Sequence, residues 1–340
     1  MQSIIKIGTR ESELAVWQAT LVKNLLAENG FSAELVFVKS EGDIDLQTPL
    51  YEMGVQGIFT RSLDIALLNN KIDIAVHSMK DVPTQLPDGI VQAAVLKRGN
   101  YKDLFVVNES TNKWPTGNSE RVKMLSETDA FLHSLQTSEH SPFTTQPLHT
   151  QLLPVAIATS SIRRKAQWLH RYPHHSIDNL RGNINTRMRK VAESSWHGAI
   201  FAAAGLERIN LRPKNAIELE WMLPAPAQGA VIIVCRKNET TIINACAALN
   251  DAPTATCTKI ERDFLRELLG GCSTPISALA QMNGDAIYFR GSILSIDGKQ
   301  KVTIEKNIFK KDAPGFGRLA AIELLQNGGQ SIADGIRKQQ

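Results

Sequence analysis

Cysteine is scarce in this sequence, and the four that occur form no CxxC pair: Cys235, Cys246, Cys257 and Cys272. Cysteines this sparse and irregular indicate a reducing compartment and argue against a disulfide framework or a zinc ribbon. Long apolar runs are also missing, because the longest, at 199–206, is far shorter than a membrane span. No apolar signal segment follows Met1. We therefore expect a cytoplasmic, metal-free protein that does not enter a membrane.

A strong excess of one charge is absent too. The 38 basic and 34 acidic residues leave a net charge of only +4, and aromatic residues make up 6% of the chain. A nucleic-acid-binding protein needs a strongly basic surface and aromatic platforms, so we expect no nucleic-acid partner. The glycine-rich GxGxxG and P-loop fingerprints of nucleotide sites are missing as well. The chain does have an ordinary 43% of hydrophobic residues over 340 positions, enough for two or three domains.

Apolar stretches of strand length alternate with amphipathic helices in the first part of the chain. We expect strands at 4–8, 33–38 and 72–77 and helices at 13–29 and 56–69. The plan repeats later, with strands at 155–158 and 198–203 and a helix at 161–171. The openings also match, Ile7-Gly8-Thr9-Arg10 against Ile157-Ala158-Thr159-Ser160. This pattern predicts two α/β units with open parallel sheets that face each other across a ligand-binding cleft.

Two further regions differ in composition. Residues 108–151 are rich in polar side chains and proline, so we expect a long surface excursion with one short helix at 119–126. From about residue 251 the pattern indicates a small α+β domain. Its expected elements are a helix at 256–269, strands at 286–294 and 301–309 joined by an Asp297-Gly298 turn, and a helix at 317–326.

Arg10 and Ser12 lie where a strand ends and a helix begins. Backbone N–H groups and the positive end of the helix attract anions at such a junction. Capping of the helix by Thr9 or Ser12 is the stronger interpretation when this junction is taken alone. An anion site at this junction would need support from other basic strand–helix junctions in the chain.

The second junction, Thr159-Ser160-Ser161-Ile162-Arg163-Arg164, carries more positive charge. Its two adjacent arginines stand in the first helical turn, where they oppose the helix dipole. The alternative is that they pair with acidic neighbours. Because the stretch between Ser160 and Asp178 contains no acidic residue, we favour an anionic ligand.

Further arginines follow at Arg181 and Arg187, around the turn-forming Gly182, and at Arg208 after an expected strand. Arg187 and Arg189 could both lie on a solvated helix face, and for Arg189 we prefer that interpretation. Guanidinium groups match carboxylates two hydrogen bonds at a time, so the whole set favours a small substrate with several carboxylates.

Two residues indicate catalysis. Asp81, beside Lys80, ends an apolar strand and is well placed for acid–base chemistry, although a surface Lys–Asp pair is about equally expected. Cys272 lies in a glycine turn rather than in an apolar run, which favours covalent chemistry. No histidine has the spacing of a neighbouring base.

Taken together, the motifs closely resemble the porphobilinogen deaminase family. The matching segments occur in the family's order: Thr9 to Ala15 with Gln18, Asp73 to Pro83, Thr159 to Arg164, Leu180 to Arg187, Pro226 to Ala230 and Gly270 to Pro275. The resemblance implies three domains, the first two like periplasmic binding proteins. Their expected bounds are 1–102 with 230–249, 103–229, and 250–340.

The resemblance also implies the activity. The family condenses four porphobilinogens head to tail with loss of ammonia and releases hydroxymethylbilane. Its dipyrromethane cofactor is built from substrate and joined by a thioether to the cysteine that matches Cys272. Asp81 would contact pyrrole N–H groups and stabilise the azafulvene cation left by ammonia, with help from Lys80. A non-catalytic anion-binding protein on the same two-lobed fold is the alternative.

The resemblance assigns the remaining site residues by position. Cofactor binding falls to Arg10, Ser12, Lys80, Asp81, Thr159, Ser160, Ser161, Arg163, Arg164, Arg181 and Gly182. Substrate binding falls to Arg10, Phe59, Arg181, Arg187, Arg208 and Gln228, although Phe59 is nearly as well explained as a core residue. We expect a monomer. The chain departs from the family at Glu52 and Gln56, where lysines are frequent in a lid loop, and at Leu269, where an acidic residue is usual.

Overall fold

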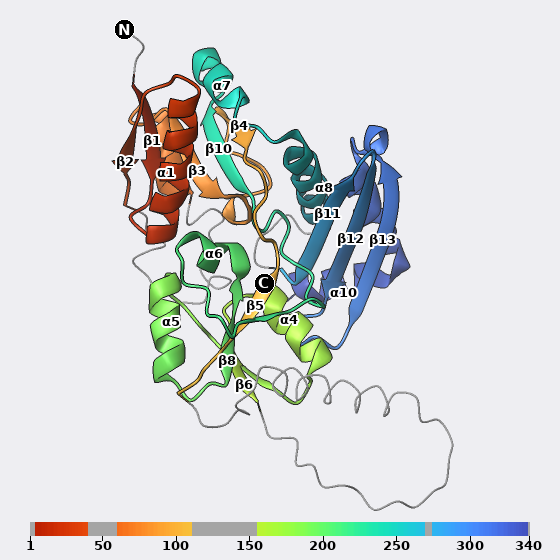
Figure 1. Cartoon of the computed structure of the whole chain (residues 1–340). Coiled ribbons are helices and arrows are strands. Elements are labelled where there is room, and N and C mark those ends of the chain that lie inside the picture. Colours follow the sequence, from red (N-terminus) through yellow and green to blue (C-terminus); the bar gives the residue numbers. More distant parts are fainter. Residues whose placement is uncertain (1–3, 40–59, 111–154, 269–273, 339–340) are drawn as a thin grey trace, which may run out of the picture.

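The computed structural model describes residues 4–39, 60–110, 155–268 and 274–338. Figure 1 shows two α/β units and a third unit formed by a separate sheet. No helix in the described part of the chain is long and apolar enough to cross a membrane. Expectations for the lid loop, Phe59, the 119–126 helix and Cys272 lie outside the described residues.

The first sheet has the strand order β2-β1-β3-β10-β4. Its strands are β1 (Ile5–Thr9), β2 (Ala33–Phe37), β3 (Ile74–Ser78), β4 (Ile90–Val95) and β10 (Val231–Arg236). Helices α1 (Glu13–Glu28) and α7 (Thr240–Ala247) bury their apolar side chains in one core, and α2 (Arg61–Leu68) buries its own in a second core. The sheet is therefore covered on both faces, as its nearly continuous apolar strands require.

The second sheet has the strand order β7-β6-β8-β5-β9. Its strands are β5 (Asp103–Val107), β6 (Ala156–Ala158), β7 (Ser176–Asp178), β8 (Gly198–Ala202) and β9 (Ile217–Glu218). Helix α4 (Ile162–Arg171) packs Trp168 into one core, while α5 (Ile184–Glu193) and α6 (Ala203–Arg208) contribute to another.

The two sheets share one topology. Ile7 pairs with β3 just as Ile157 pairs with β8, so the two similar sequence openings occupy equivalent places. The expectation of parallel sheets is wrong in one respect, because β10 and β5 each run antiparallel to their neighbours. Each of these strands follows a segment that crosses from the other unit, and it therefore enters its sheet from the opposite end.

The third unit consists of an antiparallel sheet and helices. The sheet contains β11 (Ile276–Asn283), β12 (Ala286–Leu294) and β13 (Lys301–Phe309), which confirms the two expected strands to the residue. The helices are α8 (Ala252–Leu268), α9 (Phe316–Leu324) and α10 (Gln330–Arg337), with short turns η3 (Lys310–Asp312) and η4 (Leu325–Gly329). The mixed α/β class with a small C-terminal α+β unit is thus confirmed.

Candidate active site

Two crossing segments, 96–102 and 219–230, join the α/β units and run side by side. Leu96 donates its backbone N–H to the carbonyl of Val231 at 3.0 Å, and Gly99 donates to Gly229 at 3.0 Å. Gly229 has a φ of +88°, and a Cβ there would lie 2.8 Å from the carbonyl oxygen of Gly99. Only glycine fits this close approach. The crossing therefore brings the β3 end of the first sheet close to helix α4.

The turn η2 (Met79–Asp81) directly follows β3 and carries the Lys80–Asp81 pair. Met79 is buried and donates its backbone N–H to the carbonyl of Ala230 at 3.0 Å. Lys80 Nζ donates to Oε1 of Gln228, a residue of the crossing segment 219–230, at 3.3 Å. The strand end and the turn thus place Lys80 toward the second unit, while the catalytic role of Asp81 stays a prediction.

Arg163 and Arg164 begin α4, and both bind Asp103, the first residue of β5. Arg163 Nη2 lies 2.8 Å from Asp103 Oδ2, and Arg164 Nη2 lies 2.8 Å from Oδ1. Arg163 Nη1 donates to the carbonyl of Leu223, Arg164 Nη1 donates to the carbonyl of Ile200, and Arg164 Nε donates to Asp103 Oδ1. The inference that these arginines lack an acidic partner is therefore wrong. Their partner is sixty residues away in sequence and was not visible in the neighbouring residues.

Asp103 is fully buried, so the cations around it decide its charge. Burial alone raises the pKa of Asp103, but Arg163, Arg164, the Gln228 amide and Lys80 together outweigh burial and lower this pKa to about 2. Gln228 Nε2 donates to Asp103 Oδ1 at 2.9 Å and to the carbonyl of Tyr101 at 2.8 Å. Gln228 thus links the carboxylate to Lys80 on the other unit.

Lys80 feels both signs of charge. Burial lowers its pKa to about 8, Asp81 and Asp103 oppose this shift, and Arg164 and Arg163 reinforce it. The ammonium group is therefore close to both carboxylates and both arginines. Near neutral pH it still carries its proton, and it loses that proton in mildly alkaline solution.

Arg187 and Arg181 add to this positive cluster. Burial lowers the pKa of Arg187 to about 10; Arg164 and Arg181 lower it further, whereas Asp81 raises it. Arg187 Nε donates to the carbonyl of Gly182 at 2.7 Å, so the expected turn at Gly182, with a φ of +115°, fixes this side chain. Arg181 is 5% exposed.

The first junction contributes less clearly. Ser12 occupies the N-cap position of α1, but its side chain accepts no hydrogen bond from the helix. Arg10 lies near His77. Burial lowers the pKa of His77 to about 3, and the positive charge of Arg10 contributes to this shift. In the second junction Ser161 does cap α4 by accepting from Arg164 N, and Thr159 Oγ1 accepts from Ser161 N. The expected capping of α1 by Ser12 is thus not found, and the capping by Ser161 was not predicted. A role of Ser160 in binding stays a prediction.

Two other arginines have different surroundings. Arg208 donates through Nη2 to the carbonyl of Gly229 at 2.7 Å and lies 5.5 Å over the ring of Trp17, so it bridges the two α/β units. Its substrate-binding role stays a prediction. Arg189 is exposed and pairs with Glu193 at 3.7 Å, which confirms the solvated helix face.

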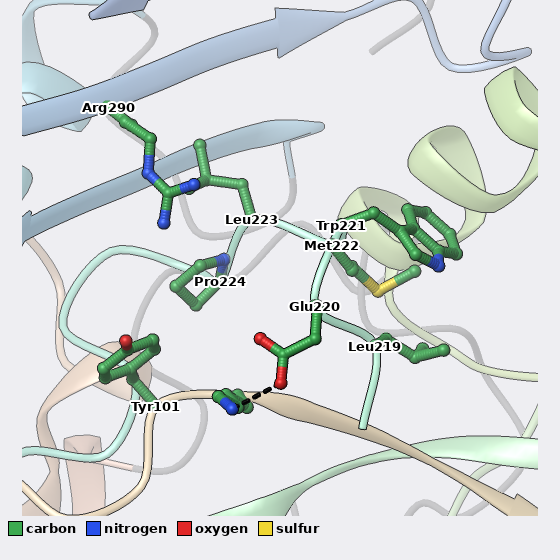
Figure 2. Close-up of a pocket in the computed structure, with 9 residues that line it drawn as sticks. Tyr101, Leu219, Glu220, Trp221, Met222, Leu223, Pro224 and Arg290 are labelled. Carbon is green, nitrogen blue, oxygen red and sulfur yellow. Dashed lines mark hydrogen bonds and ion pairs between the residues drawn. The ribbon is translucent and has the colours of Figure 1, made fainter. Parts of the chain in front are cut away.

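A cavity between the second unit and the third sheet lies outside this cluster. Figure 2 shows Tyr101, Trp221 and Arg290 among the side chains that line it. Lys102, another lining residue, is paired with Glu218 at 2.6 Å and Glu220 at 2.5 Å. Because two carboxylates pair with this lysine, the cavity offers less net positive charge than the cluster around Lys80. We therefore do not place the active site there.

Sequence reasoning missed the groups that hold the cluster in place. Asp103 was one of them, although a lone carboxylate at the start of the apolar run Leu104-Phe105-Val106-Val107 was a usable signal. The pair formed by Arg98 and Glu261 was another, with Nη1 and Oε1 2.6 Å apart and the glutamate fully buried. No local pattern indicated that pair, because 163 residues separate its partners.

The cluster has the charge of a polycarboxylate site. Lys80, Arg163, Arg164, Arg181 and Arg187 carry five positive charges, against the two carboxylates of Asp81 and Asp103. Buried charge of one sign is costly unless a partner neutralises it. A ligand with several carboxylates, such as a dipyrromethane, fits this donor set. In the described part of the chain, no group of three or more His, Cys, Asp or Glu side chains is placed to hold a metal ion.

Comparison with known proteins agrees with this chemistry. Residues 5–244 match the family model described as porphobilinogen deaminase, dipyromethane cofactor binding domain, and residues 255–326 match its C-terminal domain. Porphobilinogen deaminases from two strains of Acidithiobacillus ferrooxidans are 33% identical over 341 residues, covering 99% of both chains. Among solved structures, the chain also aligns with the BvgS VFT2 domain of Bordetella pertussis, with a TM-score of 0.37, 11% identity, and coverage of 72% of this chain and 87% of that one. The methionine binding protein MetQ has a TM-score of 0.39, 11% identity, and coverage of 72% and 89%.

Proposed function

Because this chain belongs to the porphobilinogen deaminase family, we propose that the positive cluster around Lys80 holds the carboxylates of its cofactor and substrate. The enzyme is a transferase that joins four porphobilinogen molecules head to tail with loss of ammonia. Its product is hydroxymethylbilane, which enters tetrapyrrole biosynthesis. Its cofactor is dipyrromethane. The roles of individual residues are the part that we propose here.

One observation carries these roles: five buried or partly buried cations face only two carboxylates at the junction of the α/β units. Each pyrrole of the growing chain bears an acetate and a propionate, so each addition brings two more negative charges. Guanidinium groups bind such carboxylates in pairs of hydrogen bonds. Arg10, Arg181, Arg187 and Arg208 remain our candidates for these contacts, together with Ser12 and Ser160.

Arg163 and Arg164 are assigned a second task. Asp103 already accepts hydrogen bonds from both, so they offer a ligand less charge than two free arginines would. Their net effect with Asp103 is one positive charge, held rigidly at the start of α4. We propose that this charge orients a carboxylate of the cofactor rather than neutralising several.

Asp81 is the proposed catalytic residue. Loss of ammonia leaves a positive charge on the porphobilinogen ring, and an ionised carboxylate at close range stabilises it. Lys80, beside it, keeps its proton near neutral pH and would bind a substrate carboxylate. When bound, the dipyrromethane supplies the pyrrole end to which substrate units are added.

Cys272 is the proposed attachment point of the cofactor. The other three cysteines have free thiols and are buried, and burial raises the pKa of Cys246 to about 12 and of Cys257 to about 11. Thiols that stay protonated are poor nucleophiles. This leaves Cys272 as the remaining cysteine for a thioether.

The wider assignments rest on the same family and composition. We propose the domain bounds 1–102 with 230–249, 103–229 and 250–340, with 108–151 as an excursion of the second domain. We also propose a cytoplasmic monomer without a nucleic-acid partner. The three free, buried cysteines support a reducing compartment.

An intact mass of the purified protein tests the attachment. Cys272→Ser should abolish the covalent dipyrromethane adduct and turnover, because a hydroxyl at this position is a far weaker nucleophile than a thiolate. Cys257→Ser is the control and should keep the adduct. An unchanged adduct in Cys272→Ser would disprove the attachment. A wild-type chain that stayed unmodified after incubation with porphobilinogen would contradict the cofactor assignment itself.

A further inference from the structure

Helix α8 contacts the turn that carries Lys80 and Asp81 through the side chain of Arg262. Its Nη1 donates to the carbonyl oxygens of Met79 at 3.1 Å and Val82 at 2.9 Å, and its Nη2 donates to Pro83 at 2.6 Å. These acceptors lie on both sides of Lys80 and Asp81 in the chain. One guanidinium therefore holds the turn before and after its two charged residues.

The turn has little to hold it from within. It is a three-residue 3-10 helix, closed by a backbone hydrogen bond from Val82 N to the carbonyl of Met79 at 3.3 Å. So short a helix gains too few internal hydrogen bonds to fix its own geometry. Outside contacts must therefore fix the position of Asp81, and Arg262 supplies three of them.

The helix that presents Arg262 is itself firmly anchored. The preceding residue, Glu261, is fully buried and accepts hydrogen bonds from the Arg98 guanidinium, from Ala227 N at 2.6 Å and from Ala280 N at 2.7 Å. These partners belong to the two crossing segments and to β11. Arg262 therefore extends from a helix whose position is set against all three units.

We propose that Arg262 is a positioning residue, which sets the place of Asp81 relative to α8. The inference rests on the role proposed above for Asp81. A planar fork with donors on two nitrogens reaches carbonyls on both sides of the turn, whereas one ammonium nitrogen cannot span them. Arginine is therefore required at this position, beyond a positive charge.

The test compares Arg262→Met with Arg266→Met in the full-length enzyme that carries its cofactor. Methionine keeps much of the side-chain length and is a good helix former, and Arg266 is an exposed residue one turn further along the same helix. For Arg262→Met we expect the adduct mass to be retained and KM to change little. We expect kcat to fall about 10- to 100-fold, since displacement of a catalytic group by about 1 Å has such an effect.

A pH profile separates positioning from general support of the fold. Lys80 is surrounded by Asp81, Asp103, Arg163, Arg164 and the Gln228 amide, and of these Asp81 does most to keep it protonated. When Asp81 moves away in Arg262→Met, the alkaline limb of the activity profile should move to lower pH than in Arg266→Met. A purely structural role would lower the unfolding temperature and leave kcat and this limb unchanged, which would overturn the proposal.

Two further variants keep the outcome decisive. If Arg262→Met does not fold, Arg262→Lys takes its place and should show an intermediate kcat; activity equal to that of Arg266→Met would refute the proposal. Loss of the adduct together with kcat would also refute it, because Arg262 would then act on the segment around Cys272. Asp81→Asn is measured in parallel. If Asp81→Asn is inactive and Arg262→Met is normal, this inference alone fails; if Asp81→Asn turns over normally, the role proposed for Asp81 fails.

Discussion

Lys80 changes charge in mildly alkaline solution. Burial lowers its pKa to about 8, so the folded protein holds the ammonium form below that pH and the neutral amine above it. Binding of carboxylates should accordingly weaken as the pH rises through about 8. This titration of one side chain leads to a specific expectation for its variants.

Lys80→Gln should raise KM for porphobilinogen about tenfold at neutral pH, the scale of one lost charged hydrogen bond. Because the variant is neutral at every pH, its KM should no longer rise near pH 8. Lys80→Arg, which keeps its charge, is the control and should also lose the rise. Steady-state kinetics across neutral and alkaline pH would measure both. A KM that still climbs near pH 8 in Lys80→Gln would assign the titration to another group.

The residue scale also shows what the sequence could and could not provide. The prediction that Arg163, Arg164, Lys80 and Asp81 are site residues rested on their places at strand ends and helix starts. Their pairing did not, because Asp103 approaches the arginines only when β5 inserts beside β8. Charge pairing depends on distances in space, and a survey of neighbouring residues covers only part of them.

At the scale of elements, two turn glycines in the third unit provide a matched pair. Gly284, in the β11–β12 turn, has a φ of +59° and open space around it. Gly298, in the β12–β13 turn, has a φ of +76°, and a Cβ there would lie 2.5 Å from the carbonyl oxygen of Ala166 in α4. The carbonyl oxygen of Gly298 also lies 2.8 Å from His170 Nδ1, within hydrogen-bonding distance.

Gly284→Ala should therefore cost about 1–2 kcal/mol, the penalty for a left-handed backbone with a side chain. Gly298→Ala should cost about 1–3 kcal/mol more, because the added methyl group forces the hairpin away from α4. Urea unfolding of the two variants would measure the difference. Equal losses would mean that the hairpin moves away from α4 without cost.

Elements with a regular apolar pattern were predictable, whereas elements whose place depends on partners distant in sequence were not. Strands β12 and β13 alternate clearly around an Asp297-Gly298 turn, so their bounds were correct. Strand β10 is a plain apolar run whose place between β3 and β4 depends on pairing with residues more than 130 positions earlier. The strand expected at 198–203 is found as β8, but the short helix α6 that follows it and ends at Arg208 was not predicted. Short apolar stretches do not by themselves distinguish helix from strand.

At the scale of the whole molecule, Glu261 joins three parts of the chain through one carboxylate. Glu261→Gln should lower the free energy of unfolding by about 3–5 kcal/mol, because it leaves Arg98, whose side chain is only 11% exposed, without its countercharge. Glu267→Gln is the control on the same helix. Its partner Arg318 is exposed, so the loss should be about 1 kcal/mol or less. If the two variants lose similar free energies of unfolding in denaturant, the contacts of Glu261 do not stabilise the fold more than an exposed ion pair does.

The strand order of the first sheet also has a consequence for synthesis on the ribosome. Strand β10 lies between β3 and β4, yet it is translated after the whole second sheet. Until residue 236 leaves the exit tunnel, β3 and β4 have no partner between them, and both present unpaired backbone edges. The second sheet, whose strands β5 to β9 are contiguous in the chain, can close earlier. We therefore expect the nascent chain to complete the second sheet before the first.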